Sequence, residues 1–267
     1  MGILNVTPDS FSDGGQHDDP IFAVNRAIEM FKQGASIIDI GGESTRPSAK
    51  NVSTQEQIDR VIPVIAGIRK SSIKNVLISI DTTDYAVAKQ AIEAGANWIN
   101  DISAGEDTDG NRKNMIALSA EKNIPIVLMH RQGKSDRMQE NPSYSDVCIE
   151  VKEYLQARAQ FALDSGVNKE NIILDPGIGF GKLLEHNLQL LANLESLVSL
   201  GFPILLGTSR KQFLGTIMNE DDPSQRAVGT CATTALGVQA GVQIFRVHDV
   251  IENKQAMNVA WAIKTKE

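Results

Sequence analysis

Residues 172–201 have the sequence IILDPGIGFGKLLEHNLQLLANLESLVSLG, and this stretch decides the fold. It contains a short apolar run at residues 172–174, then Asp175 and a glycine-rich turn, and then a helical pattern over residues 186–200 that stops at Gly201. An apolar strand followed by a polar turn and an amphipathic helix is typical of one β/α unit of a parallel sheet.

The same order of elements occurs eight times along the chain. The other apolar runs are residues 3–4, 37–40, 76–80, 98–99, 126–129, 204–206 and 244–247. The helical patterns that alternate with them are residues 21–32, 54–70, 84–93, 112–122, 145–165, 224–240 and 251–264. Eight such units predict an α/β protein with the (β/α)8 TIM barrel fold, in which the active site lies at the C-terminal ends of the strands.

Length and composition limit what else the chain can be. A TIM barrel takes about 250 residues, so we expect residues 1–267 to form a single domain. The first apolar run begins only two residues after Met1, and we therefore expect this strand to be truncated, with a segment missing upstream. A formal charge of -7 argues against a nucleic-acid partner, and no apolar run approaches the length of a membrane helix. The N-terminus lacks the order of a signal peptide, so a cytoplasmic location is predicted.

Polar residues gather where the apolar runs end. They are Asn5, Glu43, Asp81, Asn100, His130, Asp175, Ser209 with Lys211, and His248. Because the loops after the strands of a barrel meet at one face, these residues indicate catalysis rather than stability alone. His130 is either a wall of the pocket or an ordinary core histidine. Five glycines just past helical patterns are expected to end helices in the left-handed conformation: Gly34, Gly95, Gly166, Gly201 and Gly241.

Two loops are longer than α/β units usually need. Residues 7–20 and 43–53 are polar and rich in Gly, Ser, Asp and Pro. We expect both to be substrate loops that are mobile until the ligands are bound, since they carry few apolar anchors to offset the cost of ordering them.

Several motifs, in order along the chain, resemble the dihydropteroate synthase family. They are NVTPDSFSDGG at residues 5–15, ESTRP at 43–47, Asp81-Thr82, Asn100-Asp101, DPGIGFGK at 175–182, Ser209-Arg210-Lys211 and RVHD at 246–249. The resemblance implies a transferase of folate synthesis that condenses 6-hydroxymethyl-7,8-dihydropterin pyrophosphate with p-aminobenzoate. It also implies Mg²⁺ as a cofactor, sulfonamides as competitors and a homodimer formed by helices late in the chain.

Residue chemistry agrees with a pterin site. A pterin has two adjacent N–H donors, which match the two oxygens of one carboxylate, and Asp175 is our choice for it. Asn100 offers a donor and an acceptor, and Lys211 offers a charge for the carbonyl side. Arg246 can stack on the ring. Further residues match the family's pterin pocket: Asp81, Ile102, Met129, Phe180 and Gly207.

The pyrophosphate needs cations and hydrogen-bond donors. Asn5 resembles the family's magnesium ligand, a single hard oxygen that leaves most of the coordination sphere to waters and phosphate. The other expected pyrophosphate contacts are Thr45, Arg246, Val247 and His248. For His248 the alternatives are a helix cap and a core contact.

Asp81 is the expected centre of the chemistry. Breaking the C–O bond to pyrophosphate leaves a pterin-methyl cation, and a carboxylate close to the developing charge stabilises that state more than the neutral ground state. The alternative is that Asp81 caps the following helix. With Lys211, Arg246 and His248 it makes up the predicted catalytic set, which contains no enzyme nucleophile.

The p-aminobenzoate site is expected between the two long loops and the barrel. The family's positions are matched by Phe11, Arg46 and Pro47, with Phe180 and Lys211 opposite. The carboxylate of p-aminobenzoate is expected at the start of a helix after Lys211. Gln212 stands where serine or arginine is frequent, and Arg131 where methionine is frequent, which affects the affinity for this substrate rather than the reaction.

Three other functions were weighed. The spacing of Gly177, Gly179 and Gly181 fits neither dinucleotide-binding motifs nor a P-loop. A pterin-binding methyltransferase of the same superfamily would keep Asp81, Asn100 and Asp175 but would not need the phosphate motifs. A silent pterin-binding paralogue is expected to have lost Asp81, Asn5 or Arg246, and all three are present.

Overall fold

A ring of parallel strands forms the centre of the protein. The computed structural model describes residues 1–7, 20–43, 52–106, 114–133 and 141–266. In these residues the strands are β1 (Gly2–Asn5), β2 (Ile37–Gly41), β3 (Leu77–Asp81), β4 (Trp98–Asp101), β5 (Ile126–Met129), β6 (Ile172–Asp175), β7 (Leu205–Leu206) and β8 (Ile244–Phe245). Each coincides with one of the apolar runs of the sequence.

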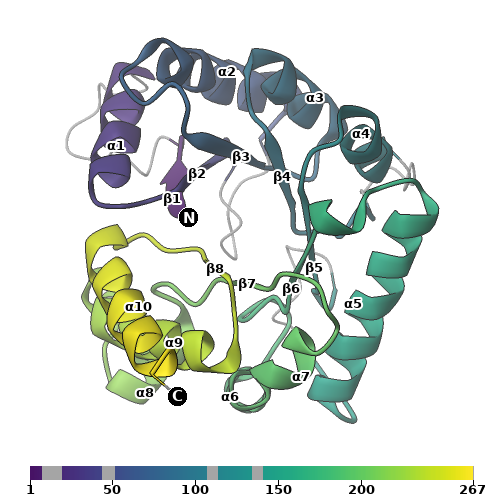
Figure 1. Cartoon of the computed structure of the whole chain (residues 1–267), viewed down its shortest axis with the longest axis vertical. Helices are drawn as coiled ribbons and strands as arrows, with labels where there is room; N and C mark the ends of the chain where they lie inside the picture. Colours follow the sequence, from purple (N-terminus) through teal and green to yellow (C-terminus); the bar gives the residue numbers. More distant parts are fainter. Residues whose placement is uncertain (8–19, 44–51, 107–113, 134–140, 267) are drawn as a thin grey trace.

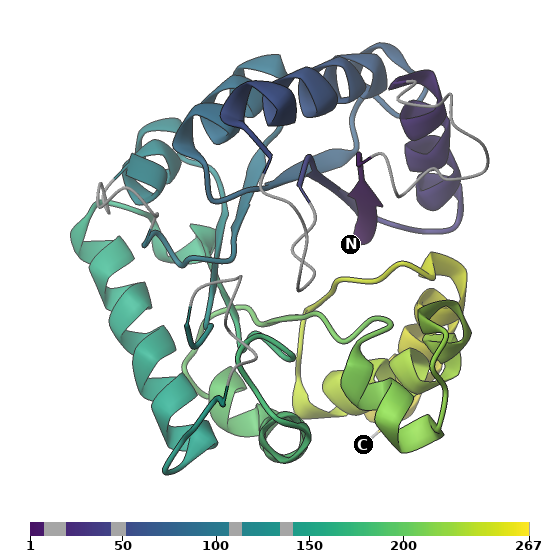
Figure 2. The ribbon, with the colours of Figure 1, turned by 180° about the vertical axis from the view of Figure 1, so that it is seen from behind.

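The strands close into a barrel. β1 to β6 pair in sequence order, and β7 pairs with β8, always in parallel. Single bridges complete the ring, from Leu174 to Ile204 between β6 and β7, and from Gly2 to Val247 between β1 and the end of β8. The helices surround this ring, as Figure 1 and the reverse view in Figure 2 show. The predicted TIM barrel is therefore confirmed.

Most helices have nearly the predicted bounds. They are α1 (Pro20–Lys32), α2 (Thr54–Lys70), α3 (Tyr85–Ala94), α4 (Asn114–Lys122), α5 (Val147–Asp164), α6 (Leu184–Ala192), α7 (Leu194–Val198), α8 (Gln212–Met218), α9 (Ala227–Ala240) and α10 (Val250–Lys264), with short 3-10 helices η2 (Lys169–Asn171) and η3 (Pro223–Arg226). The five glycines predicted to end helices all have positive φ, between 76° and 119°.

Two stretches differ from the predicted helices. The expected single helix at residues 186–200 is divided at Asn193, which ends α6 and begins α7. The helix expected from residue 224 begins at Ala227, because Pro223 starts a separate 3-10 turn that is capped by the Asp222 side chain. α8 is an additional helix between β7 and α9.

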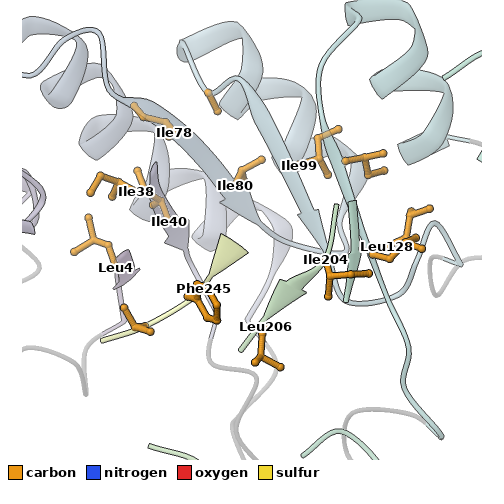
Figure 3. Close-up of a cluster of buried hydrophobic side chains, with 14 of the residues drawn as sticks. Leu4, Ile38, Ile40, Ile78, Ile80, Ile99, Leu128, Ile204, Leu206 and Phe245 are labelled. Carbon is orange, nitrogen blue, oxygen red and sulfur yellow. The ribbon is translucent and has the colours of Figure 1, made fainter. Parts of the chain in front are cut away.

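The alternation of side chains along each strand places the site inside the barrel. One set faces the helices and joins the main hydrophobic core; Leu4, Ile38, Ile40, Ile78, Ile80, Ile99, Leu128, Ile204, Leu206 and Phe245 are labelled in Figure 3. A separate, smaller cluster of Val127, Ile173 and Leu205 with Met1, Trp98 and Ile244 fills the interior. Because side chains alternate with a period of two, the next inward positions are Asn100, Met129, Asp175, Gly207 and Arg246.

β1 pairs with β2 over four residues, and the proposed upstream segment stays a prediction. Within the described residues, no helix has both the length and the apolar character required to span a bilayer.

Candidate active site

A cavity of about 750 Å³ opens at the C-terminal ends of the strands, within the size range of small-molecule sites. Its wall contains predicted site residues from every strand end or the loop that follows it except β2: Asn5, Asp81, Asn100, Ile102, Met129, Asp175, Phe180, Gly207, Lys211, Gln212, Arg246 and His248. The barrel thus brings these residues to one place.

Five predicted residues are not in that wall. Phe11, Thr45, Arg46 and Pro47 lie outside the described residues, as do most of the two long loops. Val247 is described but buried: its N–H donates to the Met1 carbonyl and its carbonyl accepts from Ile3 in the ladder that closes the barrel. These backbone groups thus serve the closure of the barrel, and the expected pyrophosphate contact of Val247 stays a prediction.

Arg246 holds two carboxylates inside the barrel. Its Nη2 donates to Asp81 Oδ2 at 2.6 Å, and its Nε donates to Asp39 Oδ2, also at 2.6 Å. Asp81 is therefore not a helix cap; α3 is capped by Asp84, whose side chain accepts from the N–H groups of Ala86 and Val87. Arg246 keeps a fixed place at the bottom of the pocket.

Asp39 was missed by the sequence analysis. It is fully buried in β2, and its Oδ2 also accepts from Asn100 Nδ2 at 3.1 Å. Because the Asn100 amide nitrogen is bonded to Asp39, the Asn100 oxygen is the atom that can accept a hydrogen bond from a ligand. The sequence does contain a signal for this residue: Asp39 stands within the apolar run IIDIG, and a charged side chain buried in a strand requires a partner.

The pocket has an unusual balance of charge. Arg246 pairs with the carboxylates of Asp39 and Asp81, while Asp175 is influenced by Lys211, Arg246 and Lys182. Burial raises the pKa of Asp81 to about 7; Arg246 opposes the rise, and Asp39 adds to it. Burial also raises the pKa of Asp175, and it lowers that of Lys211 to about 8. A carboxylate such as Asp81, buried among these groups, can stabilise positive charge that develops on a bound ligand.

The glycine-rich segment after β6 shapes one wall. Asp175 Oδ1 accepts from Gly177 N at 2.7 Å, which leaves Oδ2 and the second lone pair of Oδ1 for a ligand. The ammonium of Lys211 lies 4.6 Å from the Phe180 ring centroid and donates to the Ile178 carbonyl. A Cβ atom at Gly177 would lie 1.9 Å from the His130 carbonyl oxygen, so only glycine fits at this position without moving the backbone.

His248 is held in the pocket wall by Ser209. The Ser209 hydroxyl lies 2.9 Å from His248 Nδ1 and accepts from the His248 N–H at 3.0 Å. The residue before α10 is Asp249, whose carboxylate accepts two hydrogen bonds from Arg210. His248 is thus a pocket residue rather than a helix cap.

Asn5 was tested as a ligand for a hard cation. A Cβ at Gly41 would lie 3.6 Å from Asn5 Oδ1 and 3.7 Å from Asp81 Oδ2, so the glycine leaves room next to both oxygens. The room beside these oxygens suits an ion held by the Asn5 oxygen and otherwise by water and phosphate.

Comparison with known proteins decides the family. Residues 1–248 match the family described as "Pterin binding enzyme". Dihydropteroate synthase from Clostridium beijerinckii is 48% identical over 257 residues, covering 96% of this chain and 90% of that protein. The chain belongs to the dihydropteroate synthase family.

Solved structures of the family agree with the barrel. The Yersinia pestis enzyme with a sulfonamide drug has a TM-score of 0.90 at 42% identity, covering 99% of this chain and 94% of that chain. The Xanthomonas albilineans enzyme in complex with 7,8-dihydropteroate has a TM-score of 0.87 at 38% identity, covering 99% and 92%. These enzymes favour a synthase over the methyltransferase alternative.

Two motif residues have structural partners in this member of the family. Asp101 accepts from the Ser103 N–H and hydroxyl and from Gly105 N, so it closes the turn after β4. His130 is buried against Lys182 and is not part of the cavity wall. Lys182, which had no expected role, is in that wall.

Proposed function

We propose that the pocket condenses 6-hydroxymethyl-7,8-dihydropterin pyrophosphate with p-aminobenzoate to give 7,8-dihydropteroate and pyrophosphate. The observation that carries this proposal is the inward carboxylate of Asp81, buried beside Asp39 and ion-paired with Arg246. The 7,8-dihydropteroate complex of the Xanthomonas relative supports the same product.

The pterin is held by its polar edge. Asp175 accepts from the ring N–H and the amino group, the Asn100 oxygen accepts from a further N–H, and Lys211 donates to the carbonyl side. Ile102 and Met129 are buried in the same wall and cover the ring, together with Phe180 and the backbone at Gly207.

The substitution proceeds through a cation-like state. The bond between the exocyclic methylene carbon and the pyrophosphate oxygen breaks, and its electron pair leaves with pyrophosphate. Asp81 stabilises the positive charge that develops on the pterin, because a fixed carboxylate in a buried pocket interacts strongly with it. The amine nitrogen of p-aminobenzoate then forms the new C–N bond and loses one proton to the released pyrophosphate or to water.

The pyrophosphate is bound by Asn5, His248, Arg246 and Thr45. Asn5 would hold Mg²⁺, which when bound neutralises charge on the leaving group. His248 is positioned by Ser209 to donate from its other ring nitrogen, since Nδ1 is engaged with the Ser209 hydroxyl.

The p-aminobenzoate lies against Phe180, Lys211 and Gln212, with Phe11, Arg46 and Pro47 covering it. Gln212 Oε1 accepts from Arg226 at 3.4 Å, and this contact orients the side chain that replaces the family's usual residue. Sulfonamides compete for this position, as the drug complex of the Yersinia relative supports.

Two further properties belong to the same proposal. The protein forms a homodimer through α9 and α10, whose outer side chains include exposed Leu236, Val259 and Ile263. Of the small residues on α9, Gly237 packs on Phe245 of the barrel, while Ala232 is exposed. We also place the protein in the cytoplasm.

The direct test is turnover. Purified protein incubated with the pterin pyrophosphate, p-aminobenzoate and Mg²⁺ is expected to form dihydropteroate. Chromatography of the reaction mixture detects this product. Asp81→Asn keeps the shape of the side chain but removes its charge, and we expect it to lose turnover while still binding pterin. Absence of product with the unaltered chain would refute the synthase function and leave a silent pterin-binding protein.

A further inference from the structure

Lys182 is a buried lysine that makes no direct ion pair among the described residues, although the nearby Asp175 carboxylate influences it. The residue is 3% exposed. None of the ion pairs among the described residues includes it. Its ammonium instead donates to the carbonyls of Gly177 at 3.0 Å, Phe180 at 3.1 Å and His130 at 3.4 Å, and it lies 2.9 Å from His130 Nδ1. A buried charge requires such compensation, and here backbone oxygens and an imidazole provide it.

His130 acts as an acceptor in this cluster. Burial and the neighbouring Lys182 lower the pKa of His130 to about 3, so its ring is neutral near pH 7. The ring also contacts Tyr154 edge to face, with centroids 4.9 Å apart, which fixes its orientation. A neutral Nδ1 without a proton accepts from the ammonium of Lys182.

The cluster joins two loops of the site. Gly177, Gly179 and Gly181 all have positive φ, so their carbonyls and N–H groups adopt directions that other residues disfavour. A Cβ at Gly181 would lie 2.3 Å from the Gln132 carbonyl, which shows how closely this segment packs on the loop after β5. Lys182 connects the two loops because its ammonium donates to the carbonyls of Gly177 and Phe180 in one loop and of His130 in the other.

The segment held by Lys182 carries the side of the pocket proposed for p-aminobenzoate. Phe180 belongs to it, and the Ile178 carbonyl accepts from the Lys211 ammonium, which lies over the Phe180 ring. The backbone of Asp175 is held by β6 through its pairing with Met129, although its side chain also accepts from Gly177 N. Phe180 and the Lys211 ammonium have no such strand pairing at the segment, so a disturbed segment displaces them more than it displaces Asp175.

We propose that Lys182, with His130, is a positioning residue that sets the p-aminobenzoate wall by holding Phe180 and the Lys211 ammonium in place. This inference rests on the proposed function. Lysine suits the role because its three N–H donors face only acceptors. An apolar replacement of the same length would leave the three carbonyls without their buried donor.

The test compares the two substrates. In Lys182→Met we expect the KM for p-aminobenzoate to rise about tenfold or more, the effect of losing hydrogen bonds to a charged group, whereas the Kd for pterin measured by calorimetry changes less than about threefold. The inhibition constant of a sulfonamide that competes with p-aminobenzoate should rise in parallel. Lys89→Met, on the exposed surface of α3, is the matched control and should change neither value.

A second pair of variants tests the acceptor. His130→Asn places an oxygen near the position of Nδ1 and should keep the KM for p-aminobenzoate within about threefold, whereas His130→Leu removes the acceptor and should raise it like Lys182→Met. The proposal would be overturned if Lys182→Met kept the wild-type KM for p-aminobenzoate and the wild-type Kd for pterin. It would also be overturned if both values rose by the same factor. If Lys182→Met does not fold, equal KM values in His130→Asn and His130→Leu would overturn it. Product formation by the unaltered chain tests the proposed function separately.

Discussion

Arg246 at the end of β8 and Asp81 at the end of β3 meet across the interior of the barrel, with Nη2 and Oδ2 2.6 Å apart. The two strands are not neighbours, since β1 and β2 lie between them. The ion pair therefore exists only when the barrel is closed. It also keeps Asp81 directed at the pocket, where a second positive charge can meet the same carboxylate.

The first prediction concerns this pair. Arg246→Met leaves Asp39 and Asp81 buried without their cation, so we expect the free energy of unfolding to fall by about 3 to 5 kcal/mol. Urea denaturation at neutral pH measures it. Arg210→Met is the control: Arg210 pairs with Asp249 in a partly exposed position, and its loss should cost about 1 kcal/mol or less. Equal losses in the two variants would contradict the importance of burial.

The second prediction concerns pH. Because burial raises the pKa of Asp81 to about 7, the carboxyl becomes protonated as the pH falls through this value, and kcat should fall with it. Asp39→Asn removes a neighbouring negative charge, so the acid limb should move to lower pH by about one pH unit. Steady-state rates from pH 5 to 8 provide the measurement. The pyrophosphate group of the substrate titrates in the same way with both proteins. If the acid limb of kcat does not move in Asp39→Asn, that limb therefore reports protonation of the substrate and not of Asp81.

Sequence alone predicted the barrel because each strand and helix has its own local signal. Residues 172–174 are apolar, Asp175 and the glycines after it end the strand, and Gly201 ends the helical stretch. Side chains at strand ends, such as Asp81 and Asn100, were also predicted, because their position in the fold follows from the strand order.

Tertiary partners could not be predicted in the same way. Asp39 stands inside an apolar run, and only the closed barrel shows that its charge is used by Arg246 and Asn100. Lys182 belongs to a recognised motif, but its contacts with the loop after β5 depend on packing between two loops. Val247 is a further example: its backbone N–H and carbonyl close the barrel by pairing with Met1 and Ile3, which an apolar run alone does not show.

The third prediction concerns pterin binding. Asp175→Asn keeps an oxygen for Gly177 N but replaces the second acceptor with a donor, which faces the donors of the pterin. We expect the binding free energy to weaken by about 1.5 to 3 kcal/mol, as for loss of a charged hydrogen bond. Calorimetry with a pterin measures this. Asp164→Asn, on the exposed end of α5, should bind as the unaltered chain does, and equal affinities in all three proteins would reject Asp175 as the pterin ligand.

The fourth prediction concerns the order of bond breaking and attack. If the C–O bond breaks first, protein with the pterin substrate and Mg²⁺ but without p-aminobenzoate should release pyrophosphate slowly. Asp81→Ala should stop this release while pterin still binds, because only the cation-like state loses its stabilising charge. A coupled phosphate assay measures the release. Near-normal turnover in Asp81→Ala would rule out the role given to this carboxylate.

The last prediction concerns assembly. α9 and α10 pack side by side at the edge of the molecule in Figure 1, and Leu236 and Val259 on them are each 62% exposed. In a twofold symmetric dimer each substitution acts twice, so losing the burial of one leucine per copy should weaken association by about 3 kcal/mol or more, over a hundredfold in Kd. Light scattering at micromolar concentration should therefore give a dimer for the unaltered chain and a monomer for Leu236→Glu. Ile217→Glu is the control, since Ile217 on α8 is 56% exposed but lies outside this face. A monomeric mass for the unaltered chain would reject the dimer, and a dimeric Leu236→Glu would move the interface away from α9.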